Sequence, residues 1–198
     1  TGKTIGFVPT MGALHQGHLS LLKAANEQTS LSVCSIFVNP KQFDEKEDFN
    51  KYPRTTEQDI ELLELNGCDV LFLPNVDAVF PPSVEQVLIS YDFGFLDQPM
   101  EGAYRKGHFD GMAKVVKRLL DIVLPDSLFM GQKDYQQFSI VRRLIELTDL
   151  PTKLVVCPIL REVDGLAMSS RNVRLLPDER QRAAGISQCL KWLKTQKN

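Results

Sequence analysis

The sequence predicts an α/β fold in which a doubly wound parallel sheet carries helices on both of its faces. Short apolar runs typical of strands alternate with amphipathic helical patterns along nearly the whole chain. Several of these runs also end in a polar turn that leads directly into a helix. Strands that alternate with helices form parallel sheets, and such sheets bind their ligands outside the carboxyl ends of the strands.

The first predicted strand and helix meet at a pair of histidines. Residues 5–8 form a short β-prone run, a turn with Pro9 and Gly12 follows, and an amphipathic helical pattern covers residues 19–25. His15 and His18 lie where the strand passes into the helix. The first backbone N–H groups of a helix lack internal partners and carry the positive end of its dipole, so this junction is suited to bind an anion such as phosphate.

The next elements repeat the alternation. Residues 31–38 form an apolar run long enough for a buried parallel strand, and its end is the polar turn 39–43. The acidic stretch 44–48 is interpreted as a solvated loop in preference to a metal site. A helix capped at Thr55 and Thr56 runs through Leu65 and stops at Gly67; a strand over 69–73 and a short edge strand over 87–90 follow.

The second half of the chain contains the clearest helix, over residues 112–123, which has an apolar stripe and ends before Pro125. The glycine-containing stretch 101–111 before it reads equally well as a functional loop or as a plain connection. The elements predicted after this helix are a strand over 127–130, a helix over 135–147, a strand over 153–160, a polar turn over 161–172 and a last helix from Pro177 or Asp178 toward Trp192.

Composition favours small molecules as partners. The chain has 198 residues with a net charge of −2, so it offers no broad basic surface, and neither a nucleic acid nor a membrane is an expected partner. The sequence shows no apolar run of the ~20 residues that cross a bilayer and no secretory leader. Widely spaced cysteines predict neither a zinc site nor a disulfide framework, and we expect a cytoplasmic protein; they are Cys34, Cys68, Cys157 and Cys189.

Polar side chains lie in the turns that follow several of the predicted strands. Because the carboxyl ends of parallel strands meet at one edge of the sheet, these residues are expected to converge. They are His15, His18, Asn39, Gln42, Lys133, Asp134 and Ser169 to Arg171. Imidazole N–H groups, a lysine, two hydroxyls and a guanidinium can together bind a nucleoside triphosphate without a P-loop.

The histidines are better interpreted as charge-stabilising donors than as a metal pair, a base or a nucleophile. Zinc-binding histidines on a helix are usually spaced i, i+4 with a glutamate between them, whereas His15 and His18 are spaced i, i+3. Bound phosphate would favour their protonated form. The chain has no Gly-x-Ser-x-Gly elbow and no Cys-His neighbours, so catalysis by positioning and charge stabilisation is expected.

Six segments together resemble the pantothenate synthetase (pantoate–β-alanine ligase) family of the H-x-G-H nucleotidyltransferase superfamily. They occur in the family's order and cover nearly the whole chain. The segments are Pro9-Thr-Met-Gly-Ala-Leu-His-Gln-Gly-His18, Phe37-Val-Asn-Pro-Lys-Gln-Phe43, Tyr52-Pro-Arg-Thr55, Gly107-His-Phe-Asp-Gly111, Gly131-Gln-Lys-Asp-Tyr-Gln-Gln137 and Asp164-Gly-Leu-Ala-Met-Ser-Ser-Arg-Asn172. Lys106 departs from the pattern, since the family usually has proline after Arg105.

The resemblance implies a Rossmann-like, nucleotidyltransferase-like fold and a ligase that condenses (R)-pantoate with β-alanine. Pantoate would attack the α-phosphorus of ATP and release pyrophosphate, and the β-alanine amine would then attack the pantoyl adenylate and release AMP. Mg²⁺ would accompany the triphosphate. Two alternatives remain open: an adenylyltransferase of another small acid or phosphate substrate, and an ATP-binding module without efficient turnover.

The resemblance also assigns roles to individual residues. His18, His15 and Lys133 would be catalytic, with His18 in the position of the family's proton donor. Gln42 and Gln137 would hold pantoate, and Gln42 would also lie near β-alanine. Asp134 would contact the ribose hydroxyls and Leu160 the adenine. The full set of expected ATP contacts is Met11, Gly12, Ala13, Leu14, His15, Gln16, Gly17, His18, Gly131, Gln132, Lys133, Asp134, Leu160, Met168, Ser169, Ser170 and Arg171.

Compared with the family, the chain is expected to be a fragment. Residues 1–174 would form the nucleotide- and pantoate-binding domain, and residues 175–198 a terminal helix that leads toward a small carboxyl-terminal lid domain, largely absent here. An opening segment upstream of Thr1 is also expected. The family implies a homodimer. The sequence does not identify metal ligands.

Overall fold

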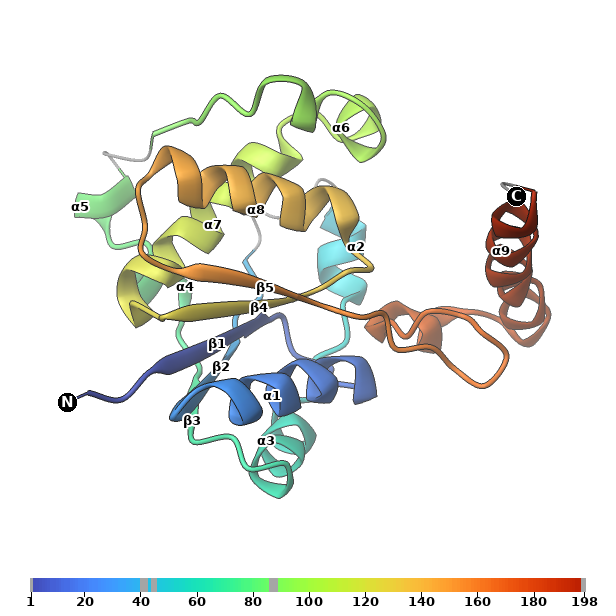
Figure 1. Cartoon of the computed structure of the whole chain (residues 1–198), viewed down its shortest axis with the longest axis horizontal. Helices are drawn as coiled ribbons and strands as arrows, with labels where there is room; N and C mark the ends of the chain where they lie inside the picture. Colours follow the sequence, from blue (N-terminus) through green and yellow to red (C-terminus); the bar gives the residue numbers. More distant parts are fainter. Residues whose placement is uncertain (1, 40–42, 44–45, 86–88, 197–198) are drawn as a thin grey trace.

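The fold is a parallel sheet between two layers of helices, as predicted (Figure 1). The computed structural model describes residues 2–39, 43, 46–85 and 89–196. Within these residues the sheet has five strands in the order β3-β2-β1-β4-β5, and every neighbouring pair is parallel. The strands are β1 (Ile5–Thr10), β2 (Leu31–Ile36), β3 (Val70–Phe72), β4 (Ser127–Gly131) and β5 (Lys153–Cys157).

Helices cover both faces of the sheet. The long helices are α1 (Gln16–Gln28), α3 (Thr56–Leu65), α7 (His108–Val123), α8 (Tyr135–Leu147) and α9 (Pro177–Thr195). In Figure 1, α7 and α8 lie on one face and α1 and α3 on the other. The shorter helical segments are α2 (Lys46–Lys51), α4 (Val76–Val79), α5 (Pro82–Glu85), α6 (Glu101–Tyr104) and the 3-10 turns η2 (Gly94–Asp97) and η3 (Ser170–Arg174).

Each face of the sheet has its own apolar core. One core joins the α7 stripe predicted from the sequence to α8 and to the strands, with Leu120, Leu128 and Leu144 almost fully buried. The other packs α1 and α3 beneath the sheet, through residues such as Leu22 and Leu63. Burial on two faces explains why three consecutive residues are buried in the middle of both β1 and β4, instead of every second one.

The strand order explains where the site lies. β1 is central, with β2 on one side and β4 on the other, so the direction of winding reverses between β1 and β4. A crevice opens at such a switch point, outside the carboxyl ends of the two strands. The His15–His18 turn follows β1 and the Lys133 turn follows β4, so the topology brings them to the two sides of the same crevice.

The structure corrects several details of the prediction. Residues 46–48 begin α2 and are not a solvated loop, while residues 44 and 45 lie outside the described residues. Residues 87 and 88 of the predicted edge strand also lie outside them, and Ile89 and Ser90 are not in a strand. The stretch 101–111, for which the sequence leaves a functional loop and a plain connection open, contains α6 and the first turn of α7.

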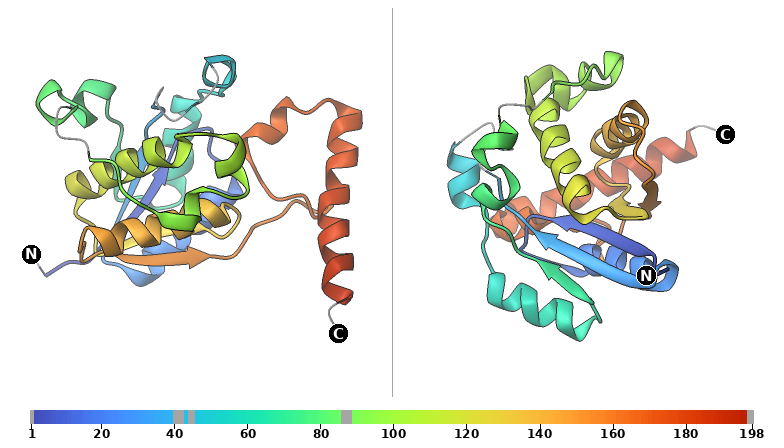
Figure 2. Two further views of the ribbon diagram at one scale, coloured as in Figure 1. Left: turned by 90° about the horizontal axis from the view of Figure 1, so that it is seen from above. Right: turned by 90° about the vertical axis from the view of Figure 1, so that its left-hand side faces the viewer.

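Helix α9 stands apart from the layered body (Figure 2). It begins at Pro177, as predicted, and only Ala184 and Ser187 along its length are buried. Neither apolar core includes a residue of α9. The division of the chain after residue 174 stays a prediction.

Among the described residues, no helix is both long enough and apolar enough to cross a lipid bilayer.

Candidate active site

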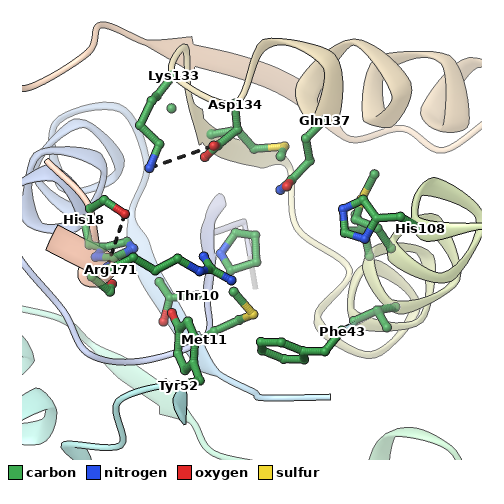
Figure 3. Close-up of a pocket in the computed structure, with 18 of the residues that line it drawn as sticks. Thr10, Met11, His18, Phe43, Tyr52, His108, Lys133, Asp134, Gln137 and Arg171 are labelled. Carbon is green, nitrogen blue, oxygen red and sulfur yellow. Dashed lines mark hydrogen bonds and ion pairs between the residues drawn. The ribbon is translucent and has the colours of Figure 1, made fainter. Parts of the chain in front are cut away.

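A cavity of about 910 Å³ lies at the switch point (Figure 3). One side is polar and comes from the turns that follow β1 and β4 and from η3. The side formed by α6 and α7 combines the apolar side chains of Tyr104, Phe109 and Met112 with the polar ones of Glu101, Arg105 and His108. The cavity can therefore hold a strongly charged group against a less polar one.

The turn that follows β1 is fixed by hydrogen bonds to its backbone. The hydroxyl of Thr10 donates to the Ser35 carbonyl at 2.7 Å and accepts from the Gly12 N–H at 3.2 Å. Gly12 has φ +77°, in the left-handed region that favours glycine. The next two N–H groups, of Ala13 and Leu14, donate to the two carboxylate oxygens of Asp59 at 2.9 and 2.8 Å.

His15 and His18 form a reciprocal cap at the start of α1. Nδ1 of His15 accepts from the Gly17 N–H at 3.1 Å, and Nδ1 of His18 accepts from the His15 N–H at 3.3 Å. The ring centroids are 4.0 Å apart. A Cβ on Gly17 would lie 2.8 Å from the His15 ring, so only glycine allows this ring to fold back over the helix start.

These contacts determine the protonation of the histidines. Both Nδ1 atoms accept hydrogen bonds, so each neutral ring carries its proton on Nε2. Burial, together with the positive charge of Lys133, lowers the pKa of His15. Burial, His15 and Lys133 lower the pKa of His18 to about 3. In this environment the histidines are thus neutral N–H donors. The expectation that a bound phosphate favours their protonated form stays a prediction.

Lys133 and Asp134 approach the histidines from the end of β4. The ammonium group of Lys133 lies 3.9 Å from Asp134 Oδ1 and 3.5 Å from the Met168 carbonyl oxygen (Figure 3). Burial raises the pKa of Asp134. Asp134 occupies the N-cap position of α8, but its side chain makes no capping hydrogen bond there.

The Ser169–Arg171 segment closes the polar side. Ser170 Oγ donates to the Ala13 carbonyl at 2.8 Å, which joins η3 to the histidine turn. The Arg171 guanidinium donates to Asp48 Oδ2 at 2.8 Å and lies over the Tyr52 ring, 5.3 Å from its centroid. Hydrogen bonds from Arg171 and Arg174 hold the pKa of the Asp48 carboxyl at about 2.

The structure brings most of the predicted site residues to one cavity. Those that line it are Met11, His15, His18, Gly131, Lys133, Asp134, Gln137, Ser169, Ser170 and Arg171. The other predicted residues that the structure describes are outside the lining: Gly12, Ala13, Leu14, Gln16, Gly17, Gln132, Leu160 and Met168. Gln42 lies outside the described residues. The roles assigned to all these residues stay predictions.

Sequence reasoning missed Asp48 and Tyr52, which line the cavity, and Asp59, which lies under it. Asp48 belongs to an acidic stretch that the sequence indicates as solvated, and its guanidinium partners are distant along the chain. Tyr52 lies in the Tyr-Pro-Arg-Thr segment, which contributes only to the family resemblance. Asp59 lies in the first turn of a predicted helix, where an acidic residue is ordinarily a surface residue that favours the helix dipole. The available signal was the spacing of Asp59 from Leu63, because residues four apart lie on the same face of a helix and Leu63 was a predicted buried position.

Fold and site together define a nucleotidyltransferase-like α/β domain with an H-x-G-H turn at its switch point. The chain belongs to the family described as pantoate-beta-alanine ligase, whose sequence model matches residues 1–198. Pantothenate synthetase of Cytophaga hutchinsonii is 47% identical over 193 residues, which cover 98% of this chain and 67% of the relative. Pantothenate synthetase of Aquifex aeolicus is 49% identical over 185 residues, covering 93% and 64%.

Solved structures of the family share the fold. Pantothenate synthetase from Thermus thermophilus has a TM-score of 0.88 at 45% identity, covering 93% of this chain and 66% of that one. Pantoate-beta-alanine ligase from Francisella tularensis, crystallised with beta-gamma ATP and beta-alanine, has a TM-score of 0.89 at 40% identity, covering 96% and 72%. The chain thus spans about two thirds of the length of these relatives.

Proposed function

We propose that this chain is the nucleotide- and pantoate-binding part of an enzyme that condenses (R)-pantoate with β-alanine. The reaction consumes ATP and yields pantothenate, AMP and pyrophosphate. The observation that carries the proposal is the convergence of His15, His18, Lys133 and Arg171 on one cavity in a chain that matches the ligase family from end to end. The ATP and β-alanine bound to the Francisella tularensis relative support the same substrates.

The triphosphate would lie along the polar side of the cavity. The Nε2–H groups of His15 and His18 and the ammonium of Lys133 are the donors nearest the H-x-G-H turn. Ser169 and Arg171 would contact the phosphates from η3. Asp134 would accept from the ribose hydroxyls, as its uncapped position at the start of α8 supports.

In the first step, a pantoate carboxylate oxygen bonds to the α-phosphorus and the bond to pyrophosphate breaks. Negative charge accumulates on the departing pyrophosphate. His18 Nε2–H and Lys133 would stabilise that charge. Because His18 is neutral and its Nδ1 is held as an acceptor, Nε2–H would donate a hydrogen bond to the leaving group and keep its proton. The enzyme supplies positioning and charge stabilisation and forms no covalent intermediate.

In the second step, the β-alanine amine attacks the carbonyl carbon of the pantoyl adenylate. The C–N bond forms, the C–O bond to AMP breaks, and the amine loses a proton. Gln137 lines the cavity on the α8 side and would hold pantoate (Figure 3). Gln42 is proposed to bind both pantoate and β-alanine. The apolar wall of Phe109 and Met112 would exclude water from the adenylate.

Mg²⁺ would enter with ATP. Among residues 2–39, 43, 46–85 and 89–196, no group of three or more His, Cys, Asp or Glu side chains is placed to hold a metal ion. The donor set therefore fits an ion held mainly by phosphate oxygens, not a resident metal. The ion would neutralise part of the triphosphate charge.

We further propose a cytoplasmic homodimer; sedimentation velocity tests the dimer.

One incubation separates the ligase from its two alternatives. The protein is mixed with MgATP, pantoate and β-alanine, and the products are separated by chromatography. Pantothenate formed together with AMP supports the ligase, and a stable adenylated product indicates an adenylyltransferase. Binding of ATP without turnover indicates a nucleotide-binding module, and absence of ATP binding contradicts all three.

A further inference from the structure

We infer that Asp59 is a positioning residue that holds the H-x-G-H turn in the geometry that presents His15 and His18 to the cavity. Asp59 lies in α3, beneath the turn and outside the lining of the cavity. Only 1% of its surface is exposed. The effect of Asp59 on nucleotide binding rests on the proposed function. Its effect on the position of the two histidines can be measured without ATP.

The carboxylate is engaged on both oxygens by the turn. Oδ2 accepts from the Ala13 N–H at 2.9 Å and Oδ1 from the Leu14 N–H at 2.8 Å. The Thr55 hydroxyl donates to Oδ1 at 3.2 Å. Two adjacent amides that point at one carboxylate form a fork, which sets the direction of the backbone and not only its distance.

The backbone of the turn needs this support. Gly12 and Ala13 both have positive φ, +77° and +49°, and a left-handed conformation at alanine carries a steric cost. The conformation aims the Ala13 and Leu14 amides inward. His15 follows directly and begins α1, so a rotation of the Leu14 peptide would carry the His15 and His18 rings away from the cavity.

The same contacts restrict how a phosphate can bind. A P-loop offers successive backbone amides to its phosphates, whereas here two amides of the turn are already bonded to Asp59. These two amides are thereby withheld from phosphate, and the two imidazoles are the side-chain donors at the same turn. Asp59 consequently affects both the position of the histidines and the choice of donors.

The test compares two aspartate-to-asparagine variants. In Asp59→Asn, one amide of the turn would face an NH₂ group in place of an acceptor. The control is Asp69→Asn, because Asp69 also accepts a hydrogen bond from a backbone amide. Its Oδ2 accepts from the Ser32 N–H at 2.8 Å and from the Ser32 hydroxyl at 3.0 Å, at the other end of the strands. NMR of the imidazoles and calorimetric titration with MgATP are the measurements, and circular dichroism reports folding.

In Asp59→Asn we expect shifted His15 and His18 signals, an unchanged His108 signal, and ATP binding weakened about tenfold or more. Asp69→Asn should stay within about twofold of the wild type. A folded Asp59→Asn with wild-type imidazole signals or wild-type ATP affinity overturns the inference.

A second variant covers the case in which Asp59→Asn does not fold. Thr55→Val removes only the side donor to Asp59 and should weaken ATP binding about two- to fivefold. An unchanged affinity there would then overturn the inference. If the wild-type chain fails to bind ATP, the proposed function is wrong, and the imidazole signals of Asp59→Asn still decide whether Asp59 positions the turn.

Discussion

At the scale of single residues, the two ring nitrogens of His18 have separate tasks. Nδ1 accepts from the His15 N–H and keeps the turn together, while Nε2 is left to donate into the cavity. Two substitutions divide these tasks. In His18→Asn, the side-chain Oδ1 can replace the imidazole Nδ1 as the acceptor. In His18→Gln, the side-chain NH₂ group can replace the imidazole Nε2–H as the donor.

We predict that His18→Asn lowers the rate of pyrophosphate release about 10²-fold, the cost of losing one preorganised donor. His18→Gln should retain more of that rate. Pre-steady-state release of pyrophosphate from ATP and pantoate measures the step. Equal rates in the wild type and His18→Asn would remove His18 from the chemistry.

The depressed pKa of His18 also predicts a pH dependence of stability. The ordinary histidine value is 6.5 and burial lowers the pKa of His18 to about 3, so between these values the unfolded chain binds the extra proton. The contribution of the neutral His18 ring to the free energy of unfolding is fully present above pH ~6.5, and it is lost as the pH falls toward 3. Because the unfolded chain binds one extra proton, the free energy of unfolding falls by at most about 1.4 kcal/mol per pH unit.

Urea unfolding at pH 7, 6, 5 and 4.5 measures this slope. His18→Asn should be less sensitive to acid than the wild type over this range, because it lacks the titrating ring. Identical slopes would show that His18 is not held neutral. Asp48, with a pKa of about 2, titrates below this range and does not interfere.

At the scale of elements, ion pairs link α2 to η3 at the cavity. Asp48 of α2 pairs with Arg171 and with Arg174 of η3, at 2.8 and 2.7 Å. These side chains are partly exposed, so the pairs contribute at most about 1 kcal/mol. Arg171 is also a proposed phosphate ligand, which makes Asp48 a competitor for it.

We predict that Asp48→Asn binds inorganic pyrophosphate about two- to fivefold more tightly while its unfolding free energy changes by less than about 1 kcal/mol. Glu47→Gln is the matched control, since Glu47 is the preceding residue and pairs with Lys51. Weaker binding by Asp48→Asn would instead mean that Asp48 orients Arg171 for the phosphate.

At the scale of the whole molecule, the layered body and α9 are nearly independent. The body has both apolar cores, and α9 adds packing through Ala184 and Ser187 and an ion pair between Arg180 and Asp164. Deleting residues 176–198 should therefore lower the unfolding midpoint only by about 2–4 °C, the equivalent of ~1 kcal/mol. Loss of cooperative unfolding would contradict a domain that ends at residue 174.

Local patterns were sufficient for most of the fold. The α7 stripe, the bounds of α8 and the start of α9 followed from apolar spacing, Pro125 and Pro177. The short helices α2 and α6 were not predicted, because segments of four to six residues have too few turns to show a periodicity. The strands β2, β3 and β5 were predicted longer than they are, since apolar runs continue past the last paired residue. The strands β1 and β4 were predicted shorter than they are, because each ends on residues typical of turns, Pro9 and Thr10 in β1 and Gly131 in β4.

The sequence by itself determined the alternation of strands and helices, the family, and the chemical kind of each turn that meets at the cavity. The tertiary structure decided which groups support which others. It placed Asp59 under Ala13 and Leu14, and Asp48 against Arg171. It also made the two histidines neutral donors. Burial and contacts between distant residues cause these effects, and neither leaves a periodic signal in the order of residues along the chain.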